Sequence, residues 1–119
     1  MRFLLAVLMV LHGIAHGVGF VVTWRLTEFQ DMPFDTALLA GTIDVGEMGI
    51  RVVGILWLTV GLAFLVAGAA TLGGASWWPM LAVVSAVCSL PLSIAGWPES
   101  RIGVVVNLIL LGVIAAGIR

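Results

Sequence analysis

The chain has 119 residues, of which 62% are hydrophobic and 9% charged, with a formal net charge of −1. Soluble domains carry about 25% charged residues, so this composition excludes an ordinary soluble domain and indicates an integral membrane protein. The length allows one domain, residues 1–119, and the charge gives no reason to expect a nucleic-acid partner. The single cysteine, Cys88, cannot form an internal disulfide.

An apolar run near the N-terminus predicts a first membrane-spanning helix over about residues 3–24. Met1-Arg2 followed by FLLAVLMVL also resembles a signal sequence. No small-x-small cleavage motif follows promptly, and the apolar run continues through His12 and His16. We therefore expect an uncleaved helix; cleavage would leave three spans and remove His12.

The only long connection, residues 25–45, contains Pro33 and four acidic residues. Its ALLA segment, residues 37–40, can make one or two helical turns lying in the membrane interface.

Three further apolar segments follow, separated by short turns rich in Gly, Ser and Pro. Short connections favour antiparallel neighbours, so the predicted fold is all-α, an up-down antiparallel four-helix bundle in the membrane. The predicted spans are 3–24, 46–72, 77–96 and 101–118.

The second span begins with charged residues and then runs for more than twenty residues without a charge. Glu47 and Arg51 are four residues apart and are expected to pair, either as part of a site or simply to neutralise an arginine near the headgroups. Gly54, Gly61 and Gly68 follow at seven-residue intervals on the same side of the helix. This side is expected to face protein rather than lipid.

The arginine count does not settle the orientation, because Arg2 and Arg119 share one side and Arg25 and Arg101 the other. All six acids lie on or near the side of the long loop. Long polar loops are more often external, so we expect a multi-pass protein of the bacterial cytoplasmic membrane with both termini in the cytoplasm.

Strong polar groups are expected in only one half of the bilayer, at depths of roughly 5–18 Å from the loop side at 1.5 Å per residue. Intramembrane polar groups normally face the interior of a bundle or a wet cavity. The arrangement predicts a polar pocket open to one side and closed by an apolar floor. The expected ligand-binding residues are His12, His16, Asp44, Glu47, Arg51, Trp57, Ser89, Ser93 and Asn107.

Several of these residues also have structural interpretations. His12 and His16 can hydrogen-bond across helices, and Asn107 can join helices without touching a ligand. His12, His16 and Glu47 have the types of side chain that bind metal, although no HExxH motif is present, and a haem would need an axial ligand from elsewhere. Gly13-xxx-Gly17 is a close-packing motif, within the bundle or across a homodimer.

Segments in all four spans resemble an uncharacterised family of small bacterial four-helix integral membrane proteins, some labelled permease-like, with a more distant likeness to DoxX-like proteins. The longer acidic loop and the charges of Asp44, Glu47 and Arg51 depart from the family pattern. The resemblance implies four spans but no reaction. The matching positions are His16, Gly19 and Phe20; Gly54, Trp57 and Leu58; Trp77 and Trp78; and Glu99, Arg101, Gly103 and Asn107.

The leading hypothesis is a non-enzymatic protein that binds or passes a small polar, anionic or amphiphilic molecule, such as a quinone or a lipid. Arg51 would attract an anionic group, and the histidines would serve as hydrogen-bond or proton partners. One alternative is a haem- or metal-binding redox subunit that uses His12 and His16. Another is a structural subunit, with the lipid bilayer, a second copy or a larger membrane complex as its partner.

Overall fold

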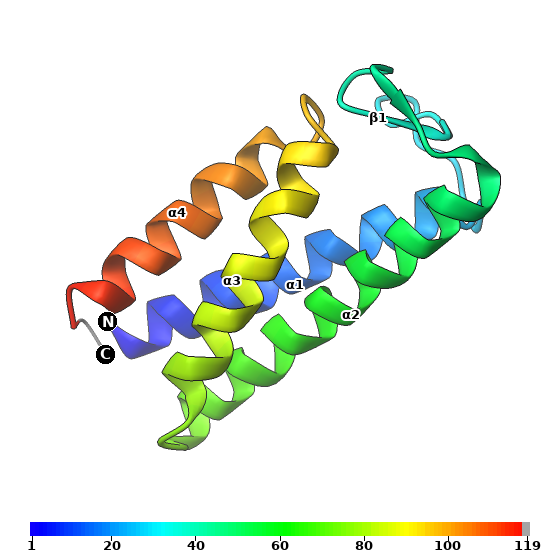
Figure 1. Ribbon diagram of the computed structural model, residues 1–119. Helices are drawn as coiled ribbons and strands as arrows, with labels where there is room; N and C mark the ends of the chain where they lie inside the picture. The colour runs from blue at the N-terminus through cyan, green and yellow to red at the C-terminus, as the bar shows by residue number, and fades with distance from the viewer. Residues whose placement is uncertain (118–119) are drawn as a thin grey trace.

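The computed structural model describes residues 1–117, which form four helices and two very short strands (Figure 1). The elements in chain order are α1 (Arg2–Thr23), β1 (Ala37–Leu38), β2 (Ile43–Asp44), α2 (Gly46–Gly73), α3 (Trp78–Ala95) and α4 (Arg101–Ala115). The first three predicted spans agree with the bounds of α1, α2 and α3 to within one residue at each end.

Three helices, α1, α2 and α3, are long and apolar enough to cross a membrane. Helix α4 is also apolar but has 15 residues. At 1.5 Å per residue it is about 22 Å long, less than the hydrocarbon thickness of about 30 Å. The predicted fourth span, 101–118, is therefore longer than the helix that the structure gives it, and its last residue, Ile118, lies outside the described residues.

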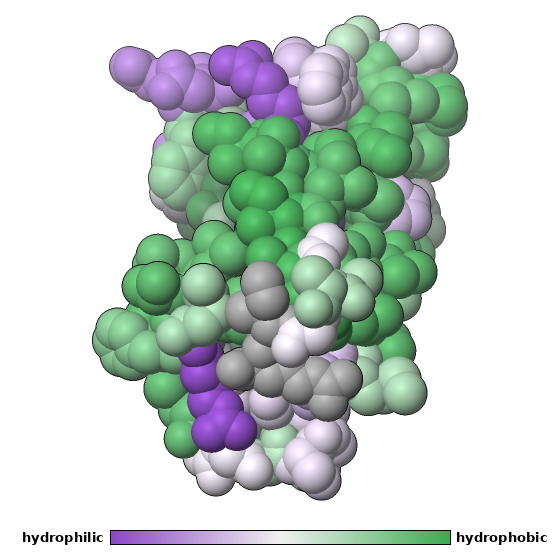
Figure 2. Space-filling model, turned by 90° about the vertical axis from the view of Figure 1, so that its left-hand side faces the viewer, coloured by the Kyte–Doolittle hydropathy of each residue, from purple (hydrophilic) through white to green (hydrophobic). Residues whose placement is uncertain are grey.

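The described helices bury polar side chains and expose apolar ones. His12, His16 and Asn107 are buried, whereas Phe3 and Met48 are 66% and 75% exposed. Figure 2 shows one face of the molecule as a broad apolar surface with hydrophilic residues near its margins. An apolar surface around buried polar side chains differs from the surface of a soluble protein and fits helices that are surrounded by lipid.

Helix α1 packs closely along α2, α2 packs on α3, and α3 packs on α4 (Figure 1). The start of α1 and the end of α4 lie at one end of the molecule, and the loop of residues 25–45 lies at the other (Figure 1). The apolar core includes Met9, Phe64, Trp78 and Leu110 from the four helices. It fills the interior between the histidines and the end that carries the start of α1.

Glycine allows the close approach of α1 and α2. Gly54, Gly61 and Gly68 are all buried, which confirms the glycine part of the predicted protein-facing side of α2, whereas Arg51 at its start is exposed. A Cβ atom on Gly61 would lie 2.8 Å from the carbonyl oxygen of Gly13, closer than real Cβ contacts allow. Gly17 has open space at the same position, so only one glycine of the Gly13-xxx-Gly17 motif packs against α2.

The ALLA segment is not helical, which corrects the prediction of interfacial helical turns. Ala37 and Leu38 form β1 and pair with β2 in an antiparallel hairpin. Leu39 and Ala40 have φ angles of 51° and 55°, which turn the chain back at the hairpin tip. The Leu39 amide donates to the carbonyl oxygen of Ala95, at 2.7 Å, and this bond holds the tip against the end of α3.

Replacing Gly61 with alanine should destabilise the protein by about 1–3 kcal/mol, because the new methyl group would press on the backbone of α1. Gly17→Ala is the matched control, since nothing lies within 4 Å of its Cβ position. Thermal unfolding in detergent micelles measures both. Equal stability of the two variants would contradict the packing described here.

Candidate functional site

A cavity of about 750 Å³ lies at the loop end of the molecule, among the ends of all four helices and the loop. His12 and His16 of α1 line one side, and Ile50, Val53 and Trp57 of α2 line another. The hairpin tip, the turn between α3 and α4, and the end of α3 complete its wall. We call this space the loop-end cavity. Its volume falls in the range of about 300–1,000 Å³ that is typical of small-molecule sites.

Behind the cavity wall, polar side chains form a buried hydrogen-bond network across α1, α3 and α4. His12 Nε2 lies 3.0 Å from Asn107 Oδ1, and His16 Nε2 lies 2.6 Å from Ser89 Oγ. Asn107 Nδ2 donates to Ser89 Oγ at 2.9 Å, and more weakly to Ser93 Oγ at 3.4 Å. His16 Nδ1 lies 2.8 Å from the carbonyl oxygen of His12, one turn earlier in α1.

These contacts assign a tautomer to each neutral imidazole. A backbone carbonyl can only accept, so His16 Nδ1 carries the proton and His16 Nε2 accepts one from the Ser89 hydroxyl. The Asn107 amide nitrogen then donates to Ser89 Oγ, which leaves Asn107 Oδ1 as the acceptor facing His12. His12 Nε2 must therefore donate, and the lone pair of His12 lies on Nδ1.

His12 Nδ1 has no hydrogen-bond partner within residues 1–117, yet it is not among the atoms shut off from solvent. His12 is only 7% exposed and is one of the residues that line the loop-end cavity. The same reasoning applies to the indole N–H of half-buried Trp57, which has no acceptor in the described part of the chain. The inner wall of the cavity thus includes one ring nitrogen that can accept a hydrogen bond and one indole N–H that can donate one, neither of which has a partner in the described part of the chain.

Aromatic rings pack around both histidines. The His12 and His16 rings meet edge to face at 4.5 Å between centroids, and Phe64 lies 4.8 Å from His12. Trp57 lies 4.9 Å from His16. The rings fix the imidazole planes, so the free nitrogen of His12 keeps its direction. Phe64 is fully buried and closes the site toward the apolar core.

The predicted site residues divide into three groups. Four of them line the cavity: His12, His16, Trp57 and Ser93. Ser89 and Asn107 lie buried in the network that holds the histidines. The charged residues expected to complete the pocket do not line it and are exposed on the surface; they are Asp44, Glu47 and Arg51.

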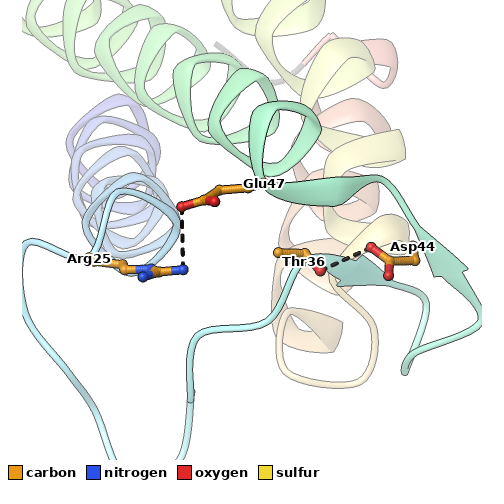
Figure 3. Close-up of polar contacts among 4 residues, drawn as sticks. All are labelled: Arg25, Thr36, Asp44 and Glu47. Carbon is orange, nitrogen blue, oxygen red and sulfur yellow. Dashed lines mark hydrogen bonds and ion pairs between the residues drawn. The ribbon is translucent and has the colours of Figure 1, made fainter.

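The expected pair of Glu47 and Arg51 is wrong. Glu47 lies 3.5 Å from Arg25, the second residue after α1, and both side chains are more than half exposed (Figure 3). The Arg51 guanidinium lies over the Trp24 ring, 5.2 Å from its centroid, while the Trp24 indole donates to the Arg51 carbonyl. The aromatic face of Trp24 thus holds Arg51 away from both Glu47 and the cavity.

Asp44 belongs to the hairpin that covers the cavity. Its Oδ1 accepts a hydrogen bond from the Gly46 amide at 2.9 Å. The Thr36 hydroxyl donates to the same oxygen, also at 2.9 Å (Figure 3). These bonds, the Gly46 amide first, lower the pKa of the Asp44 carboxyl from its ordinary value. The ionised carboxylate is therefore the form that ties β2 to the start of α2.

The geometry does not support the three-residue metal site. Glu47 is engaged by Arg25 outside the cavity, and both ring nitrogens of His16 are used within the protein. Among residues 1–117, no three His, Cys, Asp or Glu side chains are close enough to share a metal ion.

Sequence reasoning missed the rim of the cavity, where Asp35, Trp97 and Glu99 lie. Asp35 is in the long loop, and the other two are in the turn between α3 and α4. The clustering of acids on the loop side was a usable signal. The sequence did not predict that the loop folds back onto the end of α3, where the Leu39 amide donates to the Ala95 carbonyl oxygen.

Comparison with protein-family models, with curated proteins and with solved structures finds no match for this chain. The resemblance to small four-helix membrane proteins remains a prediction.

Replacing Asn107 with leucine should destabilise the protein by about 1–3 kcal/mol, because it leaves buried His12 Nε2–H without an acceptor. Thr59→Val is the control, since the exposed Thr59 hydroxyl bonds only to its own helix at Ile55. Unfolding in micelles should separate the two variants clearly. A neutral effect of Asn107→Leu would argue against the network.

Proposed function

We propose that this protein is a non-enzymatic membrane protein that binds a small amphiphilic molecule in the loop-end cavity. The observation that carries the proposal is His12 Nδ1, an acceptor on a largely buried histidine that has no partner in the described part of the chain. A purely structural histidine would have both nitrogens satisfied within the protein, as His16 has.

The same proposal includes the membrane arrangement. All four helices cross or enter the bilayer in alternating directions, with the loop of residues 25–45 on the external face of a bacterial cytoplasmic membrane and both termini in the cytoplasm. The short loops between α2, α3 and α4 support alternating directions. Helix α4 is shorter than the hydrocarbon layer is thick, and the bilayer would become locally thinner around it to match its length.

The lining favours a ligand with a polar head and an apolar body. Much of the wall is made of apolar side chains such as Ile50, Val53 and Ile102. His12 Nδ1 accepts a hydrogen bond, so the head should carry an O–H or N–H group, as a quinol or a lipid alcohol does. Arg51 is not in the wall, which removes the support for an anionic head.

A structural role has its own support, because the network joins α1, α3 and α4 whether or not a ligand binds. The two roles predict different behaviour of one variant. His12→Gln keeps an N–H donor near Asn107 Oδ1, and with that nitrogen in place its amide oxygen points away from the former position of Nδ1, so the acceptor at that position is lost. It should preserve the helix contacts and lose the ligand contact.

His12→Gln should weaken binding of 1-decanol about tenfold, which corresponds to about 1.4 kcal/mol, because the alcohol loses its acceptor. Binding is measured by native mass spectrometry and thermal shift of the protein in nanodiscs. Decyl methyl ether, which cannot donate, should bind wild-type protein and the variant equally.

Ser85→Ala is the matched control, since Ser85 is buried in α3 and, among residues 1–117, its hydroxyl bonds only to the Leu81 carbonyl oxygen of its own helix. It should leave decanol binding unchanged. Binding that is absent in wild-type protein, or equal in wild type and His12→Gln, would leave the structural role as the better account.

A further inference from the structure

The charged side chains around the loop-end cavity are mostly acidic. Asp35 and Glu99 are the charged residues of its lining. A neighbouring hollow of about 330 Å³ adds Asp31 and Arg101 and shares Glu99. Around the two hollows there are thus three carboxyl groups and one guanidinium.

The other arginines of the loop end are held elsewhere. Arg25 pairs with Glu47 and lies 3.9 Å from the centroid of the Phe34 ring. Arg51 lies over Trp24. Neither arginine is among the residues that line the cavity.

An acidic rim alone does not make a binding site, but the interior of this cavity supplies an independent feature. His12 is only 7% exposed, lines the same space, and has an Nδ1 without a partner in the described part of the chain. Trp57 and Trp97 also line the cavity and present aromatic surface to it. A lone-pair acceptor, aromatic faces and nearby carboxylates together suit a group that is positively charged and carries N–H donors.

We propose that the loop-end cavity selects amphiphilic amines, with the protonated amino group between His12 and the Asp35/Glu99 rim and the hydrocarbon chain along Ile50 and Val53. This inference rests on the proposed function and specifies the charge of the ligand. The ammonium donates to His12 Nδ1, and the rim carboxylates balance its charge. A carboxylate head of the same size would meet repulsion at the rim and has no hydrogen to donate to the histidine.

Three probes with the same ten-carbon chain test the charge preference: decylamine, 1-decanol and decanoate. Each is titrated at pH 7 into wild-type protein in nanodiscs of zwitterionic lipid, and empty nanodiscs correct for partition into the bilayer. Decylamine should bind about tenfold tighter than decanol, or more, and decanoate should bind weakest. This order follows from the sign of the rim charge.

The double variant Asp35→Asn/Glu99→Gln should lose the preference for decylamine about tenfold while keeping its affinity for decanol. Both changes are isosteric, and the asparagine amide at position 35 retains the oxygen that accepts from the Ala37 amide. Glu28→Gln is the control, because Glu28 lies outside both hollows.

The outcomes separate this inference from the proposed function. If decanol binding depends on His12 but decylamine binds no tighter, or keeps its advantage in the double variant, the preference for amines is overturned and the amphiphile site stands. If none of the three probes binds wild-type protein in a His12-dependent way, both are overturned.

Discussion

Two imidazole rings inside an apolar helical protein must find hydrogen-bond partners within the chain, because a hydrocarbon layer supplies none. Here the solution is a relay of donors and acceptors from His16 through Ser89 and Asn107 to His12. The relay begins at a backbone carbonyl, which fixes the direction of every bond in it. Its far end is the unpartnered Nδ1 of His12, a residue that lines the cavity. Both ring nitrogens of His16 have partners within the protein, whereas Nδ1 of His12 has none among the described residues. The proposed ligand chemistry depends on this difference between the two histidines.

The positions of the helices could be predicted from the sequence, since long uncharged runs, glycine turns and Trp-Pro pairs mark membrane spans. The glycine stripe of α2 was equally readable, because a seven-residue repeat keeps small residues on one side of a helix. Two features were not. Helix α4 ends at Ala115 although apolar residues continue, and the ALLA segment turns back as a hairpin. The hairpin depends on interactions with residues distant in the sequence, such as Ala95, rather than on local preference.

The polar residues of the site could be found from the sequence, because polar side chains within membrane-spanning segments cost free energy and are therefore rare there. The histidines and their serine and asparagine partners do lie together, although they come from three helices. The charges at the start of α2 were misleading. Spacing places Glu47 and Arg51 on one helix face, but Arg25 and Trp24, which directly follow α1, compete successfully for them. The spacing of residues within one helix does not show which side chains a neighbouring helix end or loop brings beside it. The acidic rim, which lies in the long loop and in the turn between α3 and α4, was not predicted for the same reason.

The most direct test of the relay is the tautomer of each histidine, read from imidazole ¹⁵N shifts of labelled protein in lipid at neutral pH. The structure requires opposite tautomers: a protonated Nδ1 on His16 and a protonated Nε2 on His12, with His12 Nδ1 bare. His12→Gln and Asn107→Asp samples would assign the signals. The same tautomer on both rings, or a proton on His12 Nδ1, would contradict the account, because the cavity would then be offered a donor in place of an acceptor.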